Sequence, residues 1–224
     1  MFTRLMIITL LLLGLSAGDA VADPWNKVLG AGLQGAADEM FEKYFAPRWR
    51  QVMETERADP LFKPGGVANL PRPYMDFWKN LMKQVPTMSS LEKLRAISGF
   101  VNVQLNGKPD QVSYGLGEYW APPREFVKNH GGDCEDFAIC KYFALRGLGF
   151  AAGDLRLLLV EIPSHNNRWH ALLAARINGE IYIVDNNFQP RDLALPHERL
   201  SGLFVLRYAF NEDGAWLYKA STRP

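Results

Sequence analysis

The segment 131–138 places one cysteine among three acids, in the order Gly-Gly-Asp-Cys-Glu-Asp-Phe-Ala. Asp133 is a residue type suited to cap a helix, and the glycines at 147 and 149 would end that helix. Cys134 then lies in the first turn, where unpaired backbone N–H groups and the positive end of the helix dipole favour a thiolate. Cys134 is therefore a candidate nucleophile.

A cysteine nucleophile needs a base, and the base needs a group that orients it. Asn178 and Gly179 give the strongest hairpin signal in the chain, and a two-residue turn there fixes the register of the flanking strands. In that register His170 lies opposite Asn187 and diagonal to Asp185, with all three side chains on one face of the sheet. The pattern selects His170 as the base and leaves Asp185 and Asn187 as alternatives for the orienting group.

The two cysteines of the chain, Cys134 and Cys140, are six residues apart in the expected helix. They would lie roughly 9 Å apart along the axis and on different faces, too far for a disulfide. We expect both thiols to be free, with Cys140 packed in the core. A zinc site is also disfavoured, because no short ligand spacing joins the cysteines to the histidines.

The first 22 residues have the pattern of a secretory signal peptide. A short basic start precedes an apolar run from Leu5 to Leu15, and Ala20-Val21-Ala22 has the small side chains of a cleavage site. A membrane anchor is the alternative, but the run is shorter than the roughly 20 residues that span a bilayer. We expect an exported protein with one domain over residues 23–224.

The charge of the chain is balanced, with 25 Lys and Arg against 24 Asp and Glu and a formal net charge of +1. Nucleic acids and anionic membranes attract strongly basic surfaces. The composition therefore gives no indication of either partner, and we expect no nucleic-acid binding.

The periodicity of apolar residues changes near residue 154, from helical to alternating. Helical patterns cover residues 28–57, 73–86, about 90–105, 122–129 and 134–147, and the third is opened by a Ser89/Glu92 capping box. Strand patterns cover residues 155–162, 169–177, 180–185, 203–210 and 215–219. The sequence predicts an α+β fold, with a helical part over about 25–150 and an antiparallel sheet over about 154–220.

Four motifs can be compared with known families: Trp-Ala-Pro-Pro-Arg-Glu at 120–125, Gly-Asp-Cys-Glu-Asp-Phe-Ala at 132–138, His-Ala-Leu-Leu at 170–173 and Val-Asp-Asn at 184–186. Together they resemble the bacterial transglutaminase-like cysteine proteinases, and within them the LapG type. The resemblance covers roughly residues 112–190. It implies a papain-like fold in which a central cysteine-bearing helix packs on the sheet. It also implies the triad Cys134, His170 and Asp185, and so favours Asp185 over Asn187.

The acids beside Cys134 pose an electrostatic problem. A carboxylate about 6 Å from the sulfur opposes ionisation by roughly 2.8 kcal/mol at an effective dielectric of 20, whereas the helix terminus returns only about 0.3 to 2 kcal/mol. A bound cation would cancel the acids, and ligands made of oxygen alone suit calcium. The resemblance also implies calcium, held by Asp133 and Glu135, with Asp136 as a further candidate.

The resemblance implies a biological role as well. LapG-type proteases are periplasmic, cut a large surface adhesin near its N-terminus at a double-alanine site, and thereby release cells from biofilm. An inner-membrane receptor that senses cyclic di-GMP sequesters them. The alternatives are a transglutaminase-type acyl transferase with the same triad and a non-catalytic binding module on the same fold. Trp120 is expected either to shape the substrate cleft or to pack in the core.

Overall fold

The structure, a computed structural model, describes residues 24–30, 32–34, 38–166, 168–187, 194–200 and 202–218. The expected signal peptide, residues 1–22, lies outside these residues, so the predicted domain boundary stays a prediction. No helix in the described ranges has the length and apolar character needed to cross a membrane.

The second half of the chain forms most of a seven-stranded sheet, in the order β1-β9-β8-β4-β5-β6-β7. Neighbouring strands are antiparallel throughout. The strands are β1 (Leu33–Gln34), β4 (Leu155–Ile162), β5 (Arg168–Ile177), β6 (Glu180–Val184), β7 (Leu195–Pro196), β8 (Val205–Phe210) and β9 (Ala215–Leu217). A separate parallel pair joins β2 (Asn106–Gly107) to β3 (Gly131–Gly132). The predicted antiparallel sheet is confirmed, and β4 has the predicted bounds.

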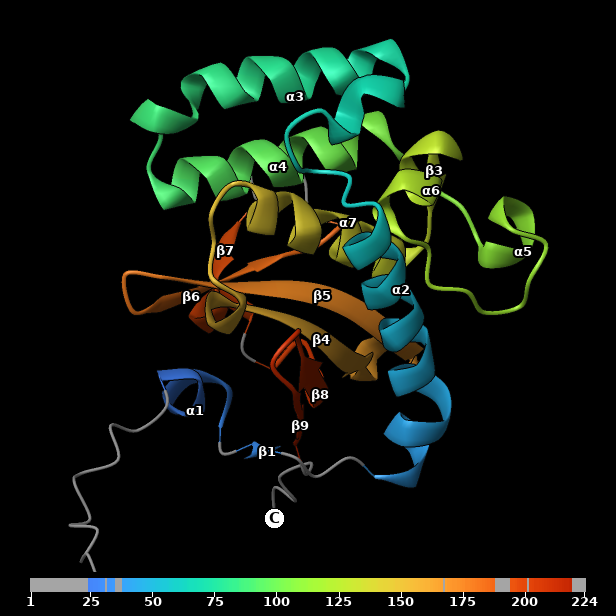
Figure 1. The fold of residues 1–224 in the computed structure, drawn as a ribbon. Coiled ribbons are helices and arrows are strands. Elements are labelled where there is room, and N and C mark those ends of the chain that lie inside the picture. Colours follow the sequence, from blue (N-terminus) through green and yellow to red (C-terminus); the bar gives the residue numbers. More distant parts are fainter. Residues whose placement is uncertain are drawn as a thin grey trace, which may run out of the picture.

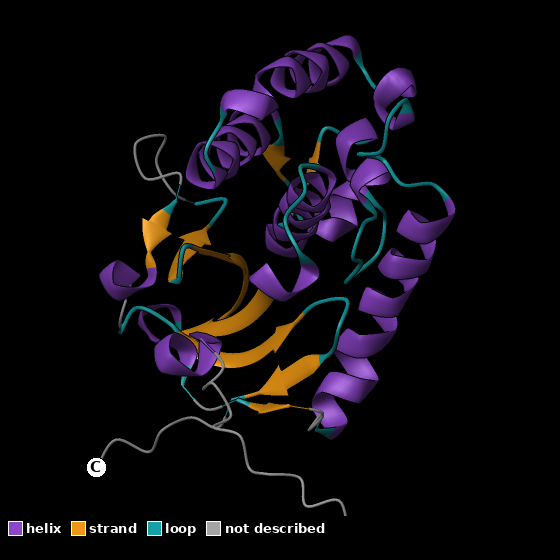
Figure 2. Cartoon of the chain, turned by 60° about the vertical axis from the view of Figure 1, so that its left-hand side comes forward, coloured by secondary structure: helices purple, strands orange, loops and turns teal. Residues whose placement is uncertain are grey.

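Helices cover one face of this sheet in layers, with α7 between the sheet and the α3–α4 pair and with α2 along one side (Figures 1 and 2). The helices are α1 (Pro24–Leu29), a π-helical turn (Phe41–Phe45) that continues into α2 (Ala46–Ala58), α3 (Arg72–Gln84), α4 (Ser90–Gln104), α5 (Asp110–Ser113), α6 (Pro123–Lys128) and α7 (Cys134–Gly147). Both hydrogen bonds of the predicted capping box are present at the start of α4. The α+β class is therefore confirmed.

Helix α7 is the centre of the fold because both of its sides are covered. Its residues 135–142 are all buried, and it packs on β5 and on α4. The sheet in turn has a second apolar layer on its other face, where Trp25 of α1 packs with Leu158 and Leu172. Burial on both faces explains why β4 reads as a continuous apolar run rather than an alternating one.

The helical pattern predicted for residues 28–57 is wrong in its first part. Helix α1 ends at Leu29, and β1 follows at the edge of the sheet, paired with β9. Gly30 has a positive φ of 85°, which ends the helix. Gly32 lies against the ring of Tyr218, and a Cβ at that position would be 2.8 Å from the ring. A close backbone contact, invisible in the local pattern, therefore replaces the helix by a strand.

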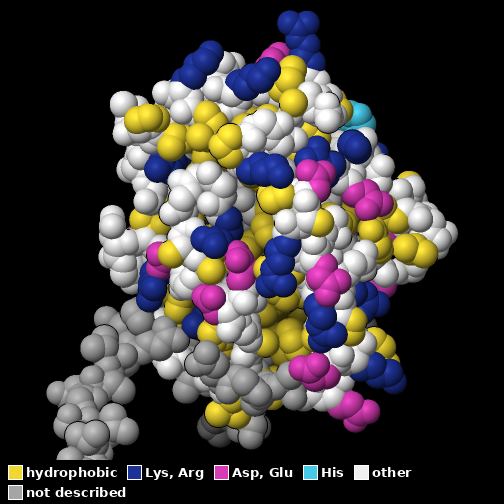
Figure 3. Space-filling model, viewed as in Figure 1, with side chains coloured by type: hydrophobic (Ala, Val, Ile, Leu, Met, Phe, Trp, Pro, Cys, Tyr) yellow, Lys and Arg dark blue, Asp and Glu magenta, His cyan; other side chains and the backbone are white. Residues whose placement is uncertain are grey.

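Between α4 and α6 the chain forms β2 and the short helix α5. On the molecular face seen in Figure 3, basic and acidic side chains alternate, with apolar side chains between them. This mixture matches the balanced charge of the sequence.

Candidate active site

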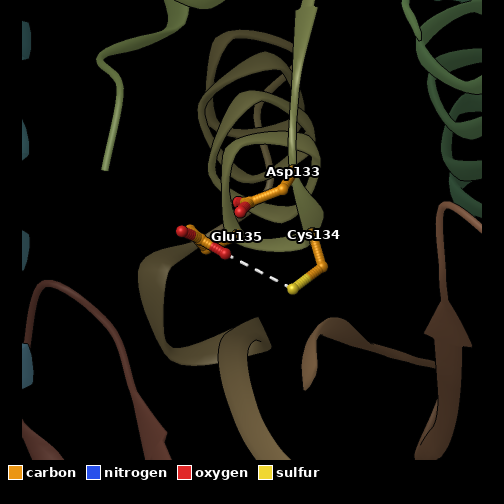
Figure 4. Close-up of side chains that lie close together, drawn as sticks. All are labelled: Asp133, Cys134 and Glu135. Carbon is orange, nitrogen blue, oxygen red and sulfur yellow. Dashed lines mark hydrogen bonds between the residues drawn. The ribbon is translucent and has the colours of Figure 1, made fainter. Parts of the chain in front are cut away.

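Cys134 is the first residue of α7, as predicted, and is half-buried. Its thiol donates a hydrogen bond of 3.3 Å to Oε2 of Glu135 (Figure 4). The sulfur also accepts a hydrogen bond from the backbone N–H of Ala171 in β5. Because Ala171 follows His170 directly, this contact brings the thiol to the strand that carries the expected base.

His170 and Asp185 are bonded to each other. Nε2 of His170 lies 2.9 Å from Oδ1 of Asp185, and the two side chains are 7% and 4% exposed. The strand pairing Ile177 with Glu180 has the register that the hairpin signal predicts. The bond to Asp185 occupies Nε2, so Nδ1 is the ring nitrogen left to act on a thiol.

The neighbours of Asp185 give Asn187 a different role from the one considered in the sequence. The backbone N–H of Asn187 donates to Oδ1 of Asp185 at 3.0 Å, and its amide nitrogen lies 3.5 Å from Nε2 of His170. Asn102 of α4 donates to the carbonyl oxygen of Asp185 at 2.7 Å. Asn187 therefore supports the carboxylate rather than replacing it. Asn102 was not predicted, because its contact spans 83 positions of the sequence.

The two cysteines are free, as predicted, and Cys140 is 1% exposed in the core of α7. Within the described residues, the groups able to hold a metal ion contain acids and Cys134 but no histidine.

Asp133 has the extended backbone of an N-cap residue, but its side chain makes no capping hydrogen bond. The prediction of a side-chain cap is therefore wrong. The Asp133 carboxyl instead interacts with that of Glu135 through a hydrogen bond. Figure 4 shows the two carboxyl groups directed toward each other above the Cys134 side chain. The backbone N–H groups at the start of the helix leave Oδ1 of Asp133 unused, buried and without a donor.

Asp136 is fully buried and has protein donors on both oxygens. Its Oδ1 accepts from the backbone N–H of Ala121 at 2.7 Å, and its Oδ2 accepts from the Tyr114 hydroxyl at 3.0 Å. A Cβ at Gly132 would lie 1.9 Å from Oδ2, so the glycine before Asp133 leaves room for this carboxyl. Asp136 thus ties the segment 114–121 to α7, which is a structural task in addition to the ligand role expected from the sequence.

Two acids that the sequence analysis did not select complete the cluster. Asp110 lies close to Asp133 and Asp136, and Asp110 with Glu118 lies close to Glu135. Three of the oxygens are buried without any hydrogen-bond donor, namely Oδ1 of Asp110, Oδ1 of Asp133 and Oε1 of Glu135. Oxygens in that state, in a set of carboxylates, suit a hard divalent cation such as calcium. Asp110 and Glu118 lie 16 to 24 positions before Cys134 in the sequence, and no spacing rule connects them to it.

The crowding of acids changes their ionisation. Burial raises the pKa of Glu135 well above its usual range, and the neighbouring Asp133 and Asp136 raise it further. Burial also raises the pKa of Asp110 to about 6. The pKa of the Cys134 thiol is raised too, first by burial and then by the charge of Glu135. These directions agree with the charge argument from the sequence: uncompensated acids oppose the thiolate.

Trp120 is 2% exposed and stacks with Phe45 and Phe210. It is a core aromatic, which decides between the two roles expected for it. Trp169, next to His170, is the more accessible ring at 37% exposure, and it stacks on Tyr208.

Comparison with known proteins adds a family and a fold. Residues 78–222 match the bacterial transglutaminase-like cysteine proteinases. No curated protein matches the chain significantly. Calcium-bound LapG of Legionella pneumophila has a TM-score of 0.56 at 24% identity, over 78% of this chain and 92% of that one. For EGTA-treated LapG of the same organism the TM-score is 0.54 at 23% identity, over 78% and 87%.

A third LapG structure gives a TM-score of 0.53 at 22% identity, over 77% of this chain and 89% of the other. At these identities the likeness concerns the fold. The family match is the stronger finding, because it covers more than half of the chain and includes Cys134, His170 and Asp185. The chain therefore belongs to the bacterial transglutaminase-like cysteine proteinases and is a cysteine peptidase.

Proposed function

We propose that the protein is a calcium-dependent periplasmic cysteine endopeptidase of the LapG type, with Cys134, His170 and Asp185 as its triad. The observation that best supports the triad is the 2.9 Å hydrogen bond between His170 and Asp185. The residue after His170 in the same strand, Ala171, donates its backbone N–H to the Cys134 sulfur. A helix-N-terminal cysteine beside an oriented imidazole is the arrangement that nucleophilic catalysis requires.

In this mechanism the Cys134 sulfur attacks the carbonyl carbon of the scissile peptide bond. His170 takes the thiol proton at Nδ1 and gives it to the leaving amine, so that the C–N bond breaks and a thioester remains. The ring then takes a proton from the water whose oxygen attacks the thioester carbon. The C–S bond breaks, and the ring returns that proton to the sulfur, so that the acid product leaves and the thiol is restored. Asp185 holds the ring through Nε2 and stabilises its charged form.

The acid cluster would hold the calcium ion. Asp133 and Glu135 offer buried oxygens without donors, and Asp110 and Glu118 lie within reach of the same position. Asp136 is predicted as a further ligand, but its oxygens accept hydrogen bonds from Ala121 and Tyr114. We therefore expect it to contribute less to calcium binding than Asp133 and Glu135. A bound divalent cation supplies positive charge that cancels the acids next to the thiol.

The substrate we propose is the N-terminal region of a large cell-surface adhesin, cut at a double-alanine site to release cells from biofilm. The inhibitory partner would be an inner-membrane receptor for cyclic di-GMP. Support comes from the family match, from the fold shared with LapG of Legionella pneumophila and from the export signal expected at residues 1–22.

A direct test is incubation of the mature protein with the N-terminal region of the host's largest repeat-rich adhesin, with calcium present, followed by mass spectrometry. We expect two fragments with new termini at a double alanine, and none with Cys134→Ala. Cross-linked products would instead indicate an acyl transferase, because an amine rather than water would resolve the thioester. Failure of a thiol-directed electrophile to label Cys134 would favour the non-catalytic alternative.

A further inference from the structure

Trp169 differs from the other tryptophans of the chain in its exposure. It is 37% exposed, whereas each of the other five is at most 9% exposed. An exposed indole keeps a large apolar surface in water, and a partner that covers this surface gains free energy. A single exposed apolar residue is common on protein surfaces, so the position of Trp169 relative to the candidate active site decides what it can do.

Trp169 lies on the side of the sheet that faces Cys134. It directly precedes His170 in β5 and shares a face of the strand with Ala171, because side chains alternate along a strand. Ala171 belongs to the apolar core between the sheet and the helices, and Cys134 packs on the same core. Neighbouring Cα atoms are about 3.8 Å apart. A peptide bond held between Cys134 and His170 therefore brings the substrate chain close to Trp169.

Aromatic contacts hold the Trp169 ring from the protein side. The ring stacks on Tyr208 of β8, with centroids 6.0 Å apart and planes at 15°, and its centroid lies 5.7 Å from that of Phe45. A tryptophan has only two side-chain torsions, so packing of this kind leaves it little freedom. The ring thus presents a preformed apolar surface, which a ligand can cover without a large loss of conformational entropy.

The same group of rings connects Trp169 with the acid cluster. Phe45 stacks on Trp120, with the ring centroids 6.1 Å apart. The residues on either side of Trp120 each donate a backbone N–H to an acid of the cluster, one to Asp110 and the other to Asp136. Trp169 is therefore joined to the candidate active site in two ways, along β5 and through side-chain contacts.

The charged neighbours of Trp169 are paired with each other. Glu161 of β4 lies directly opposite Trp169 in the sheet, and its carboxylate accepts a hydrogen bond of 2.9 Å from the guanidinium of Arg207. Because these two charges balance, they give a charged ligand little reason to bind beside the ring. The surface at Trp169 is suited to an apolar side chain.

We propose that Trp169 is a specificity-determining residue: its exposed ring is the wall of a subsite that takes an apolar side chain of the substrate close to the scissile bond. This inference rests on the proposed function and adds a preference that the triad does not provide. The ring contacts the substrate but takes no part in bond making. Its loss should therefore change the choice of substrate and leave the reactivity of Cys134 unchanged.

The test is a specificity profile of the calcium-saturated protein on a peptide library that contains every residue type, with the cleavage sites read by mass spectrometry. We expect the wild type to prefer apolar side chains at one position near the cut. Trp169→Ala should lose that preference, and its kcat/KM for the preferred peptides should fall about tenfold or more. Trp169→Phe should restore part of both. Unchanged preferences in a folded Trp169→Ala protein would overturn the inference.

Met82→Ala is the matched control, because it also removes an exposed apolar side chain but from α3. It should keep the wild-type profile. If Met82→Ala lost the preference as well, the effect would not belong to Trp169.

Alkylation of Cys134 by iodoacetamide separates a substrate contact from damage to the triad. This reagent is too small to need a subsite, so Trp169→Ala should react at the wild-type rate, whereas His170→Ala should react more slowly. Slow alkylation of Trp169→Ala would mean that the ring supports the triad rather than the substrate, and would contradict the assignment. A wild-type protein that cleaves no peptide would instead contradict the proposed function, and the inference would fall with it.

Discussion

The buried acids of the candidate site, Asp185 on one side and the acid cluster beside Cys134 on the other, differ in how many hydrogen-bond donors the protein supplies to their oxygens. Oδ1 of Asp185 accepts hydrogen bonds from His170 and from the backbone of Asn187. The cluster of Asp110, Asp133 and Glu135 instead contains three buried oxygens without donors. The oxygen of Asp185 has its donors within the chain, whereas the cluster would be completed by a positive charge from outside it, as proposed above.

This difference separates two tasks. Under the proposed function, the chain itself orients His170 as the base, while a calcium ion would decide whether the thiol can react. A protease built in this way would fold its His-Asp pair in any medium and gain activity only where calcium is present.

The largest effect is expected for Cys134→Ala, which removes the nucleophile. Proteolysis should fall to the level of the uncatalysed reaction, while the thermal midpoint changes little because a half-buried thiol contributes small packing volume. Cleavage of the adhesin fragment, followed on gels, checks this result. Cys140→Ala, at the buried thiol of the same helix, serves as the control and should stay active. Activity in a folded Cys134→Ala protein would contradict the assignment of Cys134 as the nucleophile of the triad.

Asp185→Asn tests the complete group. We expect kcat to fall by about 10²-fold or more, because an amide neither fixes the tautomer nor stabilises the imidazolium. Asn187→Ala should cost less, since its backbone N–H still donates to Asp185. The kcat values of the two variants decide the order, and a larger loss for Asn187→Ala would mean that the orienting residue is misassigned.

Chelation tests the incomplete group. Excess EGTA should lower activity by up to about 10²-fold, because the uncompensated carboxylates should raise the pKa of the Cys134 thiol by about two units. Calcium should restore activity better than magnesium, which gives up its water reluctantly. Glu135→Ala should weaken calcium binding and activity together. Full activity in chelator, with no calcium binding by calorimetry, would mean that the acids have a structural role only.

Glu118 and Asp136 should have different roles in the acid cluster, one in calcium binding and the other in stability. Glu118→Gln removes an exposed acid of the cluster, and we expect calcium affinity to fall about 5- to 30-fold with little change in stability. Asp136→Ala removes the acceptor of Ala121 and Tyr114 and should destabilise the fold by about 1 to 3 kcal/mol. Calorimetry and urea unfolding measure the two effects. A loss of stability in Glu118→Gln together with a loss of calcium affinity alone in Asp136→Ala would mean that the two roles are assigned the wrong way round.

The smallest effect concerns Glu56, a buried acid of α2 outside the cluster. Burial raises its pKa to about 7, so the folded state binds a proton that the unfolded state releases near pH 4.5. Stability should therefore fall as the pH rises from about 4.5 to about 7, by about 1 to 3 kcal/mol. In calcium-saturated protein, Glu56→Gln should remove this part of the pH dependence, as measured by urea unfolding at several pH values. The same dependence in the wild type and in Glu56→Gln would contradict the assignment to Glu56.

Local patterns predicted much of the molecule because the relevant contacts are close in sequence. The capping box before α4 and the hairpin at Asn178 need only a few neighbouring residues. The hairpin register also predicted that His170 shares a face with Asp185 and Asn187, since side chains alternate strictly along paired strands, and the family resemblance favoured Asp185. By contrast, the strand at Leu33 was missed, because it depends on the approach of Tyr218 from the other end of the chain.

The sequence by itself determined the cysteine at a helix start, the His-Asp pair, the α+β class and the presence of acids that oppose a thiolate. Only the tertiary structure decided that the Asp133 side chain makes no capping hydrogen bond, that Trp120 is in the core, and that Asp110, Glu118 and Asn102 lie near the site. Periodicity and turn chemistry act over a few residues, so a sequence can show them. Acids and cations interact through space, and the packing of α4, α7 and the sheet sets their distances.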